Sequence, residues 1–401
     1  MDIIQTLAQQ LNLTAEQVGK TVQLIDEGNT IPFIARYRKE VTGSLDDSVL
    51  RTLDEKLTAL RNLAQRKQEV QDLIGAQGKL TEEVRAAIER AATVTEVDDI
   101  YRPFRPKRKT RASVARERGL EDLAILLFAQ EKSYTPSIEE QAARFVDPER
   151  EVPDVAAALQ GAMDIVAEEV SDNADYRREL RRLTFDAGSL TSKAAKEEDS
   201  VYAMYYDFSE PLRKLPGHRI LAINRGEKEE FLKVALTVPE DVVLGYLYNR
   251  VLSGNRSPAE PYVREAVTDA YNRLIAPSIE REIRNDLFDT ACEGAIKVFS
   301  DNLGHLLMQP PLKGKVVLGF DPGYAHGCKL AVVDPTGKVL DTAVVYPTIK
   351  PRAEEAARVV KRLIRNYAVD VVAIGNGTAS RESEAFIAGL LKQIEKPCKY
   401  I

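Results

Sequence analysis

The spacing of the apolar residues changes along the chain, and this change limits the folds that the chain can adopt. Over most of the first 187 residues, apolar positions recur three or four apart, which is typical of helices with one buried face. The clearest stripe, in the segment 46–74, consists of Val49, Leu50, Leu53, Leu57, Leu60, Leu63 and Val70. In about the last ninety residues, short apolar runs alternate with turn residues, which indicates strands. The chain is therefore predicted to be mainly α with a C-terminal α/β domain.

Further helices are predicted over 80–101, 152–171 and 173–187, and Thr81 stands where a side-chain oxygen can cap the first of them. The small, polar segment 188–200 is predicted to be a linker. Residues 218–238 hold two apolar runs around 225–228, which predicts a hairpin. Helices resume from about Val242 to Met308. They include a long helix over 275–295 that Pro277 either begins or kinks.

The C-terminal segment has the element order of a ribonuclease H-like sheet. Strands are predicted over 315–321, 328–334 and 338–347, and a tight turn between the second and third indicates an antiparallel meander. A helix (351–368), a buried strand (369–375) and another helix (380–394) follow. Nothing after Ile401 supplies a fifth strand, so this domain is expected to be incomplete in the chain.

The composition excludes several classes of protein. With 401 residues, 44% apolar and 29% charged, the chain reads as soluble and globular. It has no apolar run of membrane length and no basic patch of a signal peptide, so a cytoplasmic protein without membrane partners is expected. Its three cysteines and three histidines complete no disulfide framework and no zinc motif, so no metal site and no cofactor are expected. The net charge of −6 does not suggest a polyanion binder overall, so any polyanion site must be identified from the local distribution of charge.

One basic stretch, Tyr101–Gly119, has eight arginines and lysines against a single glutamate. Pro103 and Pro106 prevent a helix from spreading these charges along one face, so an extended loop is expected. Arginines beside Tyr101 and Phe104 suit the phosphates and bases of nucleic acids. The predicted nucleic-acid contacts are Arg102, Arg105, Lys107, Arg108, Lys109 and Arg111. The alternative is that these arginines pair with nearby acids, for instance Glu96, Asp98 and Asp99.

Two smaller basic groups are more simply explained by a solvated face or by intramolecular pairing. One group consists of Arg36, Arg38 and Lys39, and the other is the helical segment 176–182.

Asp321 ends the first predicted C-terminal strand, before Pro322 and Gly323. A carboxylate there can hold Mg²⁺ against a phosphate, because magnesium prefers hard oxygen ligands. Two-metal phosphoryl chemistry needs several converging acids, however, and the end of the fourth strand carries Asn376 between two glycines. The alternative is that Asp321 accepts hydrogen bonds from the turn amides. Asp321 is therefore a catalytic candidate, and no catalytic residue is predicted with more support.

Several stretches, spread over nearly the whole chain, resemble the bacterial Tex proteins, which are transcription accessory factors. They are TIPFIARYRKEVTGSLDD, DDIYRPFRPKRKTRASVARERGLEDLA, HRILAINRGEKE, and VLGFDPGYAHGCKLAVVDPTGKVLDTAVVYP with AIGNGTASRESE. The resemblance implies a helical N-terminal region with a helix-turn-helix-like part (1–190), a connecting hairpin and long central helix (191–311), and a partial ribonuclease H-like domain of the YqgF kind (312–401). It also implies that the family continues into helix-hairpin-helix elements and an S1 RNA-binding domain, before which this chain stops, and that the family lacks nuclease activity.

The favoured hypothesis is a non-catalytic transcription accessory factor that binds RNA or DNA, mostly through the backbone, with the transcription machinery or the ribosome as further candidate partners. One alternative is an Mg²⁺-dependent, structure-specific nuclease of the resolvase type that uses Asp321. Nucleotide hydrolysis is another alternative, because actin-like ATPases share the sheet and an early Asp-x-Gly turn. A last alternative is a protein-interaction scaffold built on the helical half.

Overall fold

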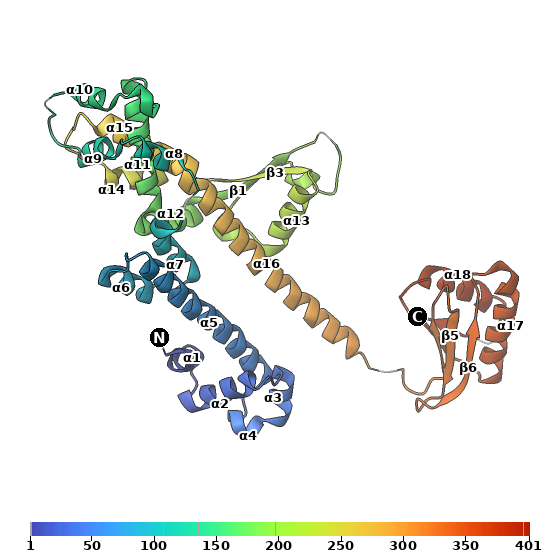
Figure 1. Ribbon diagram of the computed structural model, residues 1–401. Helices are drawn as coiled ribbons and strands as arrows, with labels where there is room; N and C mark the ends of the chain where they lie inside the picture. Colours follow the sequence, from blue (N-terminus) through green and yellow to red (C-terminus); the bar gives the residue numbers. More distant parts are fainter. Residues whose placement is uncertain (1, 107, 135, 197, 311, 396) are drawn as a thin grey trace. The chain divides into compact units, whose positions relative to one another are not determined.

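The computed structural model describes residues 2–106, 108–134, 136–196, 198–310, 312–395 and 397–401. The chain forms two compact units, Met1–Val298 and Phe299–Ile401 (Figure 1). The first is mainly helical and the second is built on a mixed sheet, so the predicted fold class is confirmed. Among the described residues, no helix has both the length and the apolar character needed to cross a membrane.

The first unit begins with five helices. They are α1 (Ile3–Leu11), α2 (Ala15–Asp26), α3 (Ile31–Tyr37), α4 (Lys39–Thr42) and α5 (Asp47–Ala76). Helix α5 confirms the predicted long helix, and Asp46 caps it by accepting a hydrogen bond from the Val49 amide at 2.9 Å. One end of its apolar stripe packs against α1 and α2, where Leu53 and Leu57 contact Leu7 and Val18. That this region resembles a helix-turn-helix remains a prediction.

The next helices lead into the largest core. They are α6 (Glu82–Arg90), α7 (Val94–Tyr101), α8 (Arg111–Glu117), α9 (Glu121–Ala129), α10 (Ile138–Ala142), α11 (Val155–Asp172) and α12 (Ala174–Ala187). Thr81 caps α6 as predicted, since its hydroxyl accepts from the Val84 amide at 3.3 Å. Helix α11 is buried on most sides, because its alanines let α8, α9 and α15 (Glu260–Asp269) pack closely around it.

The predicted linker at 188–200 is wrong, because β1 (Ser189–Ala194) is the central strand of a three-stranded antiparallel sheet. It pairs with β2 (Asp207–Pro211) and β3 (Leu232–Thr237). The apolar alternation of a strand is hidden in the sequence because one inward position is a serine. Ser192 is buried, and its hydroxyl donates to the Tyr205 carbonyl oxygen at 2.7 Å.

The predicted hairpin at 218–238 is also wrong. Its first half is helix α13 (Gly217–Lys228), and only the second half is the strand β3. Ile220, Ile223 and Gly226 are buried at helical spacing, so the apolar run belongs to a helix face and the polar residues 225–228 form its last turn. Glu230, with φ of +62°, reverses the chain into β3.

Helices then resume as predicted. They are α14 (Glu240–Val251), α15, and α16 (Ala276–Leu307), with a π-helical segment, Ala270–Ile275, before α16. Pro277 is the second residue of α16, but it does not begin a separate helix, because the helical backbone runs without a break from α15 through the π-helical segment into α16. The π-helical turn directly before Pro277 accommodates the missing amide hydrogen of the proline. The predicted stripe is buried at Ile275, Ile279, Ile283 and Ala291, whereas Ala295 is exposed.

The second unit holds a five-stranded sheet in the order β6-β5-β4-β7-β8. Its elements are β4 (Val317–Asp321), β5 (Cys328–Val333), β6 (Val339–Val345), α17 (Lys350–Asn366), β7 (Val371–Ile374), α18 (Ser380–Leu391) and β8 (Lys399–Tyr400). The antiparallel meander β4-β5-β6 is confirmed, and β7 pairs parallel with β4. Side chains of α17 and α18 bury one apolar cluster with the sheet, which includes Phe320, Leu363 and Ile387.

The expectation that no fifth strand exists is wrong. The two-residue strand β8 pairs parallel with β7, and the Ile374 amide donates to the Ile401 carbonyl oxygen at 2.9 Å. The sequence gives no sign of this strand, because backbone hydrogen bonds hold it and both of its side chains are exposed.

Candidate nucleic-acid interface

The predicted extended loop over the basic stretch is confirmed only in part. Helix α7 ends at Tyr101, and Arg102–Phe104 form a single 3-10 turn that contains Pro103. The backbone is extended at Arg105, but α8 begins after Thr110 and carries Arg111 and Arg116. The prolines therefore keep Arg105, Arg108 and Lys109 out of the two helices, whereas the sequence beyond Thr110 is free to form a helix.

The two aromatic residues of this stretch anchor it instead of offering a stacking surface. Tyr101 is 6% exposed and packs with Val70 and Ile74 of α5, and Phe104 lies partly buried against the same cluster. The Phe104 carbonyl oxygen also accepts from the Gln77 side chain at 2.9 Å. Base stacking on Tyr101 has no support in this geometry, since protein covers the ring, and Phe104 is left with only part of its surface exposed.

Three arginines of the stretch form ion pairs within the protein. Arg102 lies 3.2 Å from Asp172, Arg116 lies 2.7 Å from Glu168, and Arg118 pairs with Glu151. Burial lowers the pKa of Arg102, and the nearby charge of Arg177 lowers it further, while Asp172 opposes both effects. Arg102 is thus a structural cation.

The acids that were named as partners for the stretch have other roles. Asp98 pairs with Arg66 at 2.6 Å, and Glu96 accepts from the Ala92 amide at 2.6 Å. Asp99 accepts hydrogen bonds from Arg177 and Arg181. The pairing alternative therefore holds for part of the stretch, but with acids from 151, 168 and 172 that lie far away in the sequence.

The other predicted contacts remain accessible to a ligand. Arg105, Arg108 and Arg111 are exposed, and no hydrogen bond or ion pair joins their side chains to other residues that the structure describes. Lys109 is exposed and lies 3.9 Å from the equally exposed Glu117, a separation at which water screens the pair. Lys107 lies outside the described residues.

Lys109, Arg111 and Arg118 line a cavity of about 440 Å³ between α8 and α11, and Asp164 is the one acid in its lining. Burial raises the pKa of the Asp164 carboxyl, while Arg273 and Arg111 act in the opposite direction. Because Arg118 is paired with Glu151, the cations of this lining that can attract an anion such as a phosphate group are Lys109 and Arg111.

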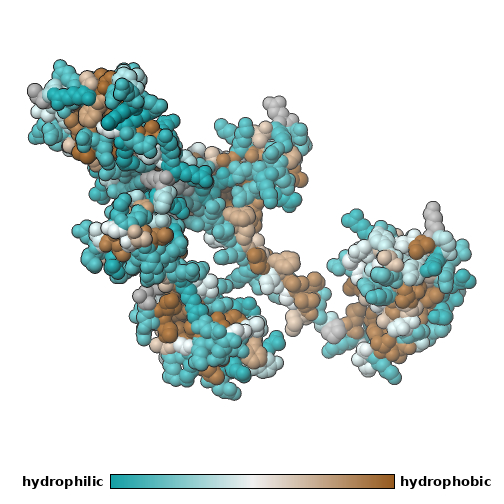
Figure 2. Space-filling view, viewed as in Figure 1, coloured by the Kyte–Doolittle hydropathy of each residue, from teal (hydrophilic) through white to brown (hydrophobic). Residues whose placement is uncertain are grey.

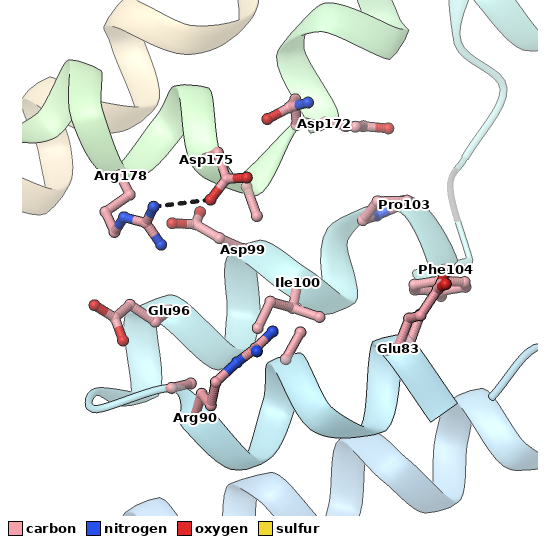
Figure 3. Close-up of a pocket in the computed structure, with 15 residues that line it drawn as sticks. Glu83, Arg90, Glu96, Asp99, Ile100, Pro103, Phe104, Asp172, Asp175 and Arg178 are labelled. Carbon is pink, nitrogen blue, oxygen red and sulfur yellow. Dashed lines mark hydrogen bonds and ion pairs between the residues drawn. The ribbon is translucent and has the colours of Figure 1, made fainter. Parts of the chain in front are cut away.

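A second cavity, of 480 Å³, lies on the other side of the 3-10 turn (Figure 3). Pro103 and Phe104 contribute to its wall, and Arg178 pairs there with Asp175 at 2.8 Å. The charged residues that line it are Glu83, Arg90, Glu96, Asp99, Asp172, Asp175 and Arg178. Five carboxylates against two guanidinium groups repel phosphate, so the acidic cavity is separate from the candidate interface.

The prediction that the basic residues of 176–182 pair with acids within the protein is confirmed. Arg177 is fully buried and donates to Asp99 at 2.7 Å and to Glu282 at 3.0 Å, and Arg181 contacts both acids. Burial by itself would raise the pKa of Glu282, but Arg181 and Arg177 hold it below its usual value. This buried network joins α7, α12 and α16, so these arginines hold the fold together and are not available to a ligand.

Asp321 lies exposed at the end of β4, beside the parallel strand β7. Within the described ranges, no hydrogen bond to its carboxylate is found, so the proposed bonds from turn amides are not observed. Asn376 follows β7 and is also exposed. The described part of the chain contains no group of three or more histidine, cysteine or acidic side chains able to hold a metal ion.

One pair near Asp321 was missed by the sequence reasoning. The Tyr324 hydroxyl donates to Glu382 of α18 at 2.8 Å, and this hydrogen bond raises the pKa of Tyr324. The two residues are 58 positions apart, so no local pattern connects them. Their pairing fixes the loop after β4 against the start of α18.

Three sequence models of one family match this chain. The Tex-like protein N-terminal domain matches residues 1–75, the Tex central region-like model matches 133–299, and the Tex protein YqgF-like domain matches 315–401. The chain belongs to the Tex family. Similar proteins include YdcI of Bacillus subtilis (44% identical over 99% of this chain), Protein tex of Bordetella pertussis (40% over 97%) and the transcriptional accessory protein Tex of Neisseria gonorrhoeae (38% over 98%). The chain covers 56%, 51% and 52% of these Tex relatives, about half of their length.

Proposed function

We propose that this Tex-family chain is a non-catalytic, nucleic-acid-binding transcription accessory factor, and that residues 105–111 provide one contact with phosphates. The name of the gonococcal relative, transcriptional accessory protein Tex, supports the biological setting. The observation that supports the contact is that only some cations of the basic stretch are paired. Arg102, Arg116 and Arg118 form ion pairs with acids, whereas Arg105 and Arg108 reach solvent without an acidic partner among the described residues. Arg111 is also exposed and forms no ion pair there, although its charge acts on Asp164.

Exposed cations without partners are suited to polyanions, because each phosphate that they neutralise releases condensed counterions. The cavity between α8 and α11 adds a recess lined by Lys109 and Arg111, with Asp164 as its one acid and with Arg118 already paired to Glu151. We infer that the ligand is bound by its backbone, since no exposed aromatic or amide side chain of the stretch is placed to recognise a base. The chain as a whole has a net charge of −6, which repels a polyanion. The attraction for phosphates must therefore come from a local concentration of cations such as the basic stretch.

The absence of catalysis is inferred from Asp321. Cleavage of a phosphodiester by two metal ions requires several acids around them. Asp321 lies at the end of β4 beside β7, which is followed by Gly375 and Asn376, and a neutral amide is a poor substitute for a carboxylate ligand.

The test replaces Arg105, Lys107, Arg108 and Lys109 by alanine and measures binding of labelled single-stranded and duplex RNA and DNA at several salt concentrations. If each cation contacts one phosphate, the slope of log K against log salt should fall by about 3 on a single strand. Replacement of Lys228, Lys233 and Arg281, which are exposed elsewhere on the first unit, is the matched control and should leave the slope nearly unchanged. Unchanged binding by the first variant would remove the basic stretch from the mechanism.

A nuclease is the second candidate, and the exposed position of Asp321 at a strand end favours it. Incubation with branched DNA and Mg²⁺ or Mn²⁺ separates the two functions. Cleavage that is lost on Asp321→Asn would support the nuclease, whereas intact DNA after binding supports the non-catalytic factor.

A scaffold role is the third candidate, and the end of α16 favours it. Figure 2 shows apolar surface on the C-terminal part of this helix, where Ile296, Phe299 and Leu307 are 68%, 69% and 73% exposed. Such a run suits a protein partner. Co-purification with RNA polymerase or ribosomes that survives nuclease treatment would support this role, whereas association that depends on nucleic acid would support the first candidate.

A further inference from the structure

We propose that α3 and the start of α4 form a second contact, which binds single-stranded nucleic acid by stacking an unpaired base on Tyr37. The α3 surface is defined as Phe33, Arg36, Tyr37, Arg38 and Lys39. This proposal rests on the proposed function, in that the chain binds nucleic acid, and it adds the class of ligand: a strand whose bases are free to stack.

The aromatic part of the α3 surface is a tilted pair of rings. The rings of Phe33 and Tyr37 have centroids 5.2 Å apart at an interplanar angle of 48°, and the Arg38 guanidinium lies 5.0 Å from the centroid of Phe33. Arg38 also donates to the Tyr37 carbonyl oxygen at 3.0 Å. Tyr37 is the outer ring of this pair and is 61% exposed, more than any other tyrosine of the chain. An aromatic ring in this position offers a base a π-surface without a large rearrangement.

The charges around Tyr37 favour phosphate. Arg36 and Lys39 are exposed, and the side chain of neither forms a hydrogen bond or an ion pair with a residue in the described ranges. Glu40 is the one acid among residues 36–40. The surface arginines of α12 differ, since Arg178 and Arg182 form pairs with Asp175 and Glu179. Intramolecular pairing therefore explains the α12 cations but leaves the charges of the α3 surface without compensation.

The scaffold under the α3 surface is fixed. Ile34, on the opposite side of α3 from solvent, is fully buried against Leu24, Leu45 and Leu50. Pro32 stands at the start of the helix, and Gly43, with φ of +70°, ends α4. Because these packing and end signals hold the helix, Tyr37 and its cations are presented without the cost of ordering a loop.

The ligand is a single strand for a physical reason. In a duplex, the bases are stacked on one another and their faces are not available, whereas an unpaired base can place its face on an aromatic ring. Cations on either side of the ring then take the adjoining phosphates.

The test uses the 401-residue chain with labelled single-stranded DNA and RNA oligonucleotides of about 15 nucleotides, and a duplex of the same sequence. Tyr37→Ala should weaken binding to the single strands by about 5-fold or more, the lower end of the loss for a stacking aromatic, and should change duplex binding little. Tyr37→Phe keeps the ring and should bind as the parent does. Because Tyr37 is mostly exposed, thermal melts should confirm that both variants fold like the parent.

The outcomes separate this proposal from the first. Loss of single-strand affinity in Tyr37→Ala, with retention in Tyr37→Phe, supports the α3 surface whether or not the variant of the basic stretch binds. Equal affinity of Tyr37→Ala and the parent overturns it, even where the basic stretch proves essential. Equal losses for single strand and duplex would also overturn it, since stacking on an unpaired base would not be the cause.

Discussion

The replacement Asp99→Asn is the sharpest test of how the first unit is held together. Asp99 is 5% exposed, and its two carboxylate oxygens accept from Arg177 at 2.7 Å and from Arg181 at 2.8 Å. Both arginines also contact Glu282, so two positive and two negative charges balance in the buried network. An asparagine keeps the shape of the side chain but leaves one positive charge uncompensated.

The expected cost follows from that imbalance. Removal of one partner from a buried ion pair costs about 3–5 kcal/mol, and we expect about 3 kcal/mol because the amide oxygen still accepts one hydrogen bond. For a unit of this size, such a loss lowers the melting temperature by about 6 °C. Arg178→Ala is the control, because Arg178 lies next to Arg177 on α12 but forms an exposed ion pair. The Arg178–Asp175 pair has an N···O distance of 2.8 Å, but its side chains are 62% and 75% exposed, so its loss should cost below about 1 kcal/mol.

The assay is thermal unfolding followed by the far-ultraviolet circular dichroism of the helices, with hydrogen exchange across α7, α12 and α16. The double variant Asp99→Asn with Arg177→Met restores the charge balance, so it should be at least about 1 kcal/mol more stable than the sum of the single losses predicts. Equal melting temperatures for Asp99→Asn and Arg178→Ala, or strict additivity in the double variant, would refute the account of a charge-balanced buried network.

Further predictions concern pH and packing. The folded-state pKa of Glu282 lies below the unfolded value of 4.5, so its ionised form stabilises the fold above about pH 4.5 and this contribution is lost as the pH falls through the folded pKa. Glu282→Gln should therefore be less stable than the parent at pH 7. Its melting temperature should fall less than that of the parent between about pH 5 and about pH 3. Gly226→Ala would place a Cβ 2.7 Å from Leu232 and should cost about 1–3 kcal/mol in urea unfolding. Gly245→Ala, in α14 with no heavy atom within 4 Å, should instead stabilise by about 0.5–1 kcal/mol, and equal effects would contradict the packing.

Local sequence signals were sufficient where each element carries its own pattern. The stripe of α5, the cap at Thr81 and the turn at Asp334, whose carboxylate accepts from the Thr336 amide at 2.8 Å, are all set by residues a few positions apart. Local sequence signals failed where residues distant in the chain stabilise the element. Ser192 is buried in a central strand because the Tyr205 carbonyl satisfies its hydroxyl, and β8 exists because β7 offers it an unpaired edge.

The candidate interface divides in the same way. The sequence by itself determined that cations crowd into 101–119 and that prolines end the helix before them, because charge and backbone restriction are properties of the residues themselves. Only the tertiary structure decided which cations are available, because Asp172, Glu168 and Glu151 neutralise Arg102, Arg116 and Arg118 from positions 33–70 residues away. An ion pair depends on the distance between two groups in space, and for residues so far apart in the chain packing alone sets that distance.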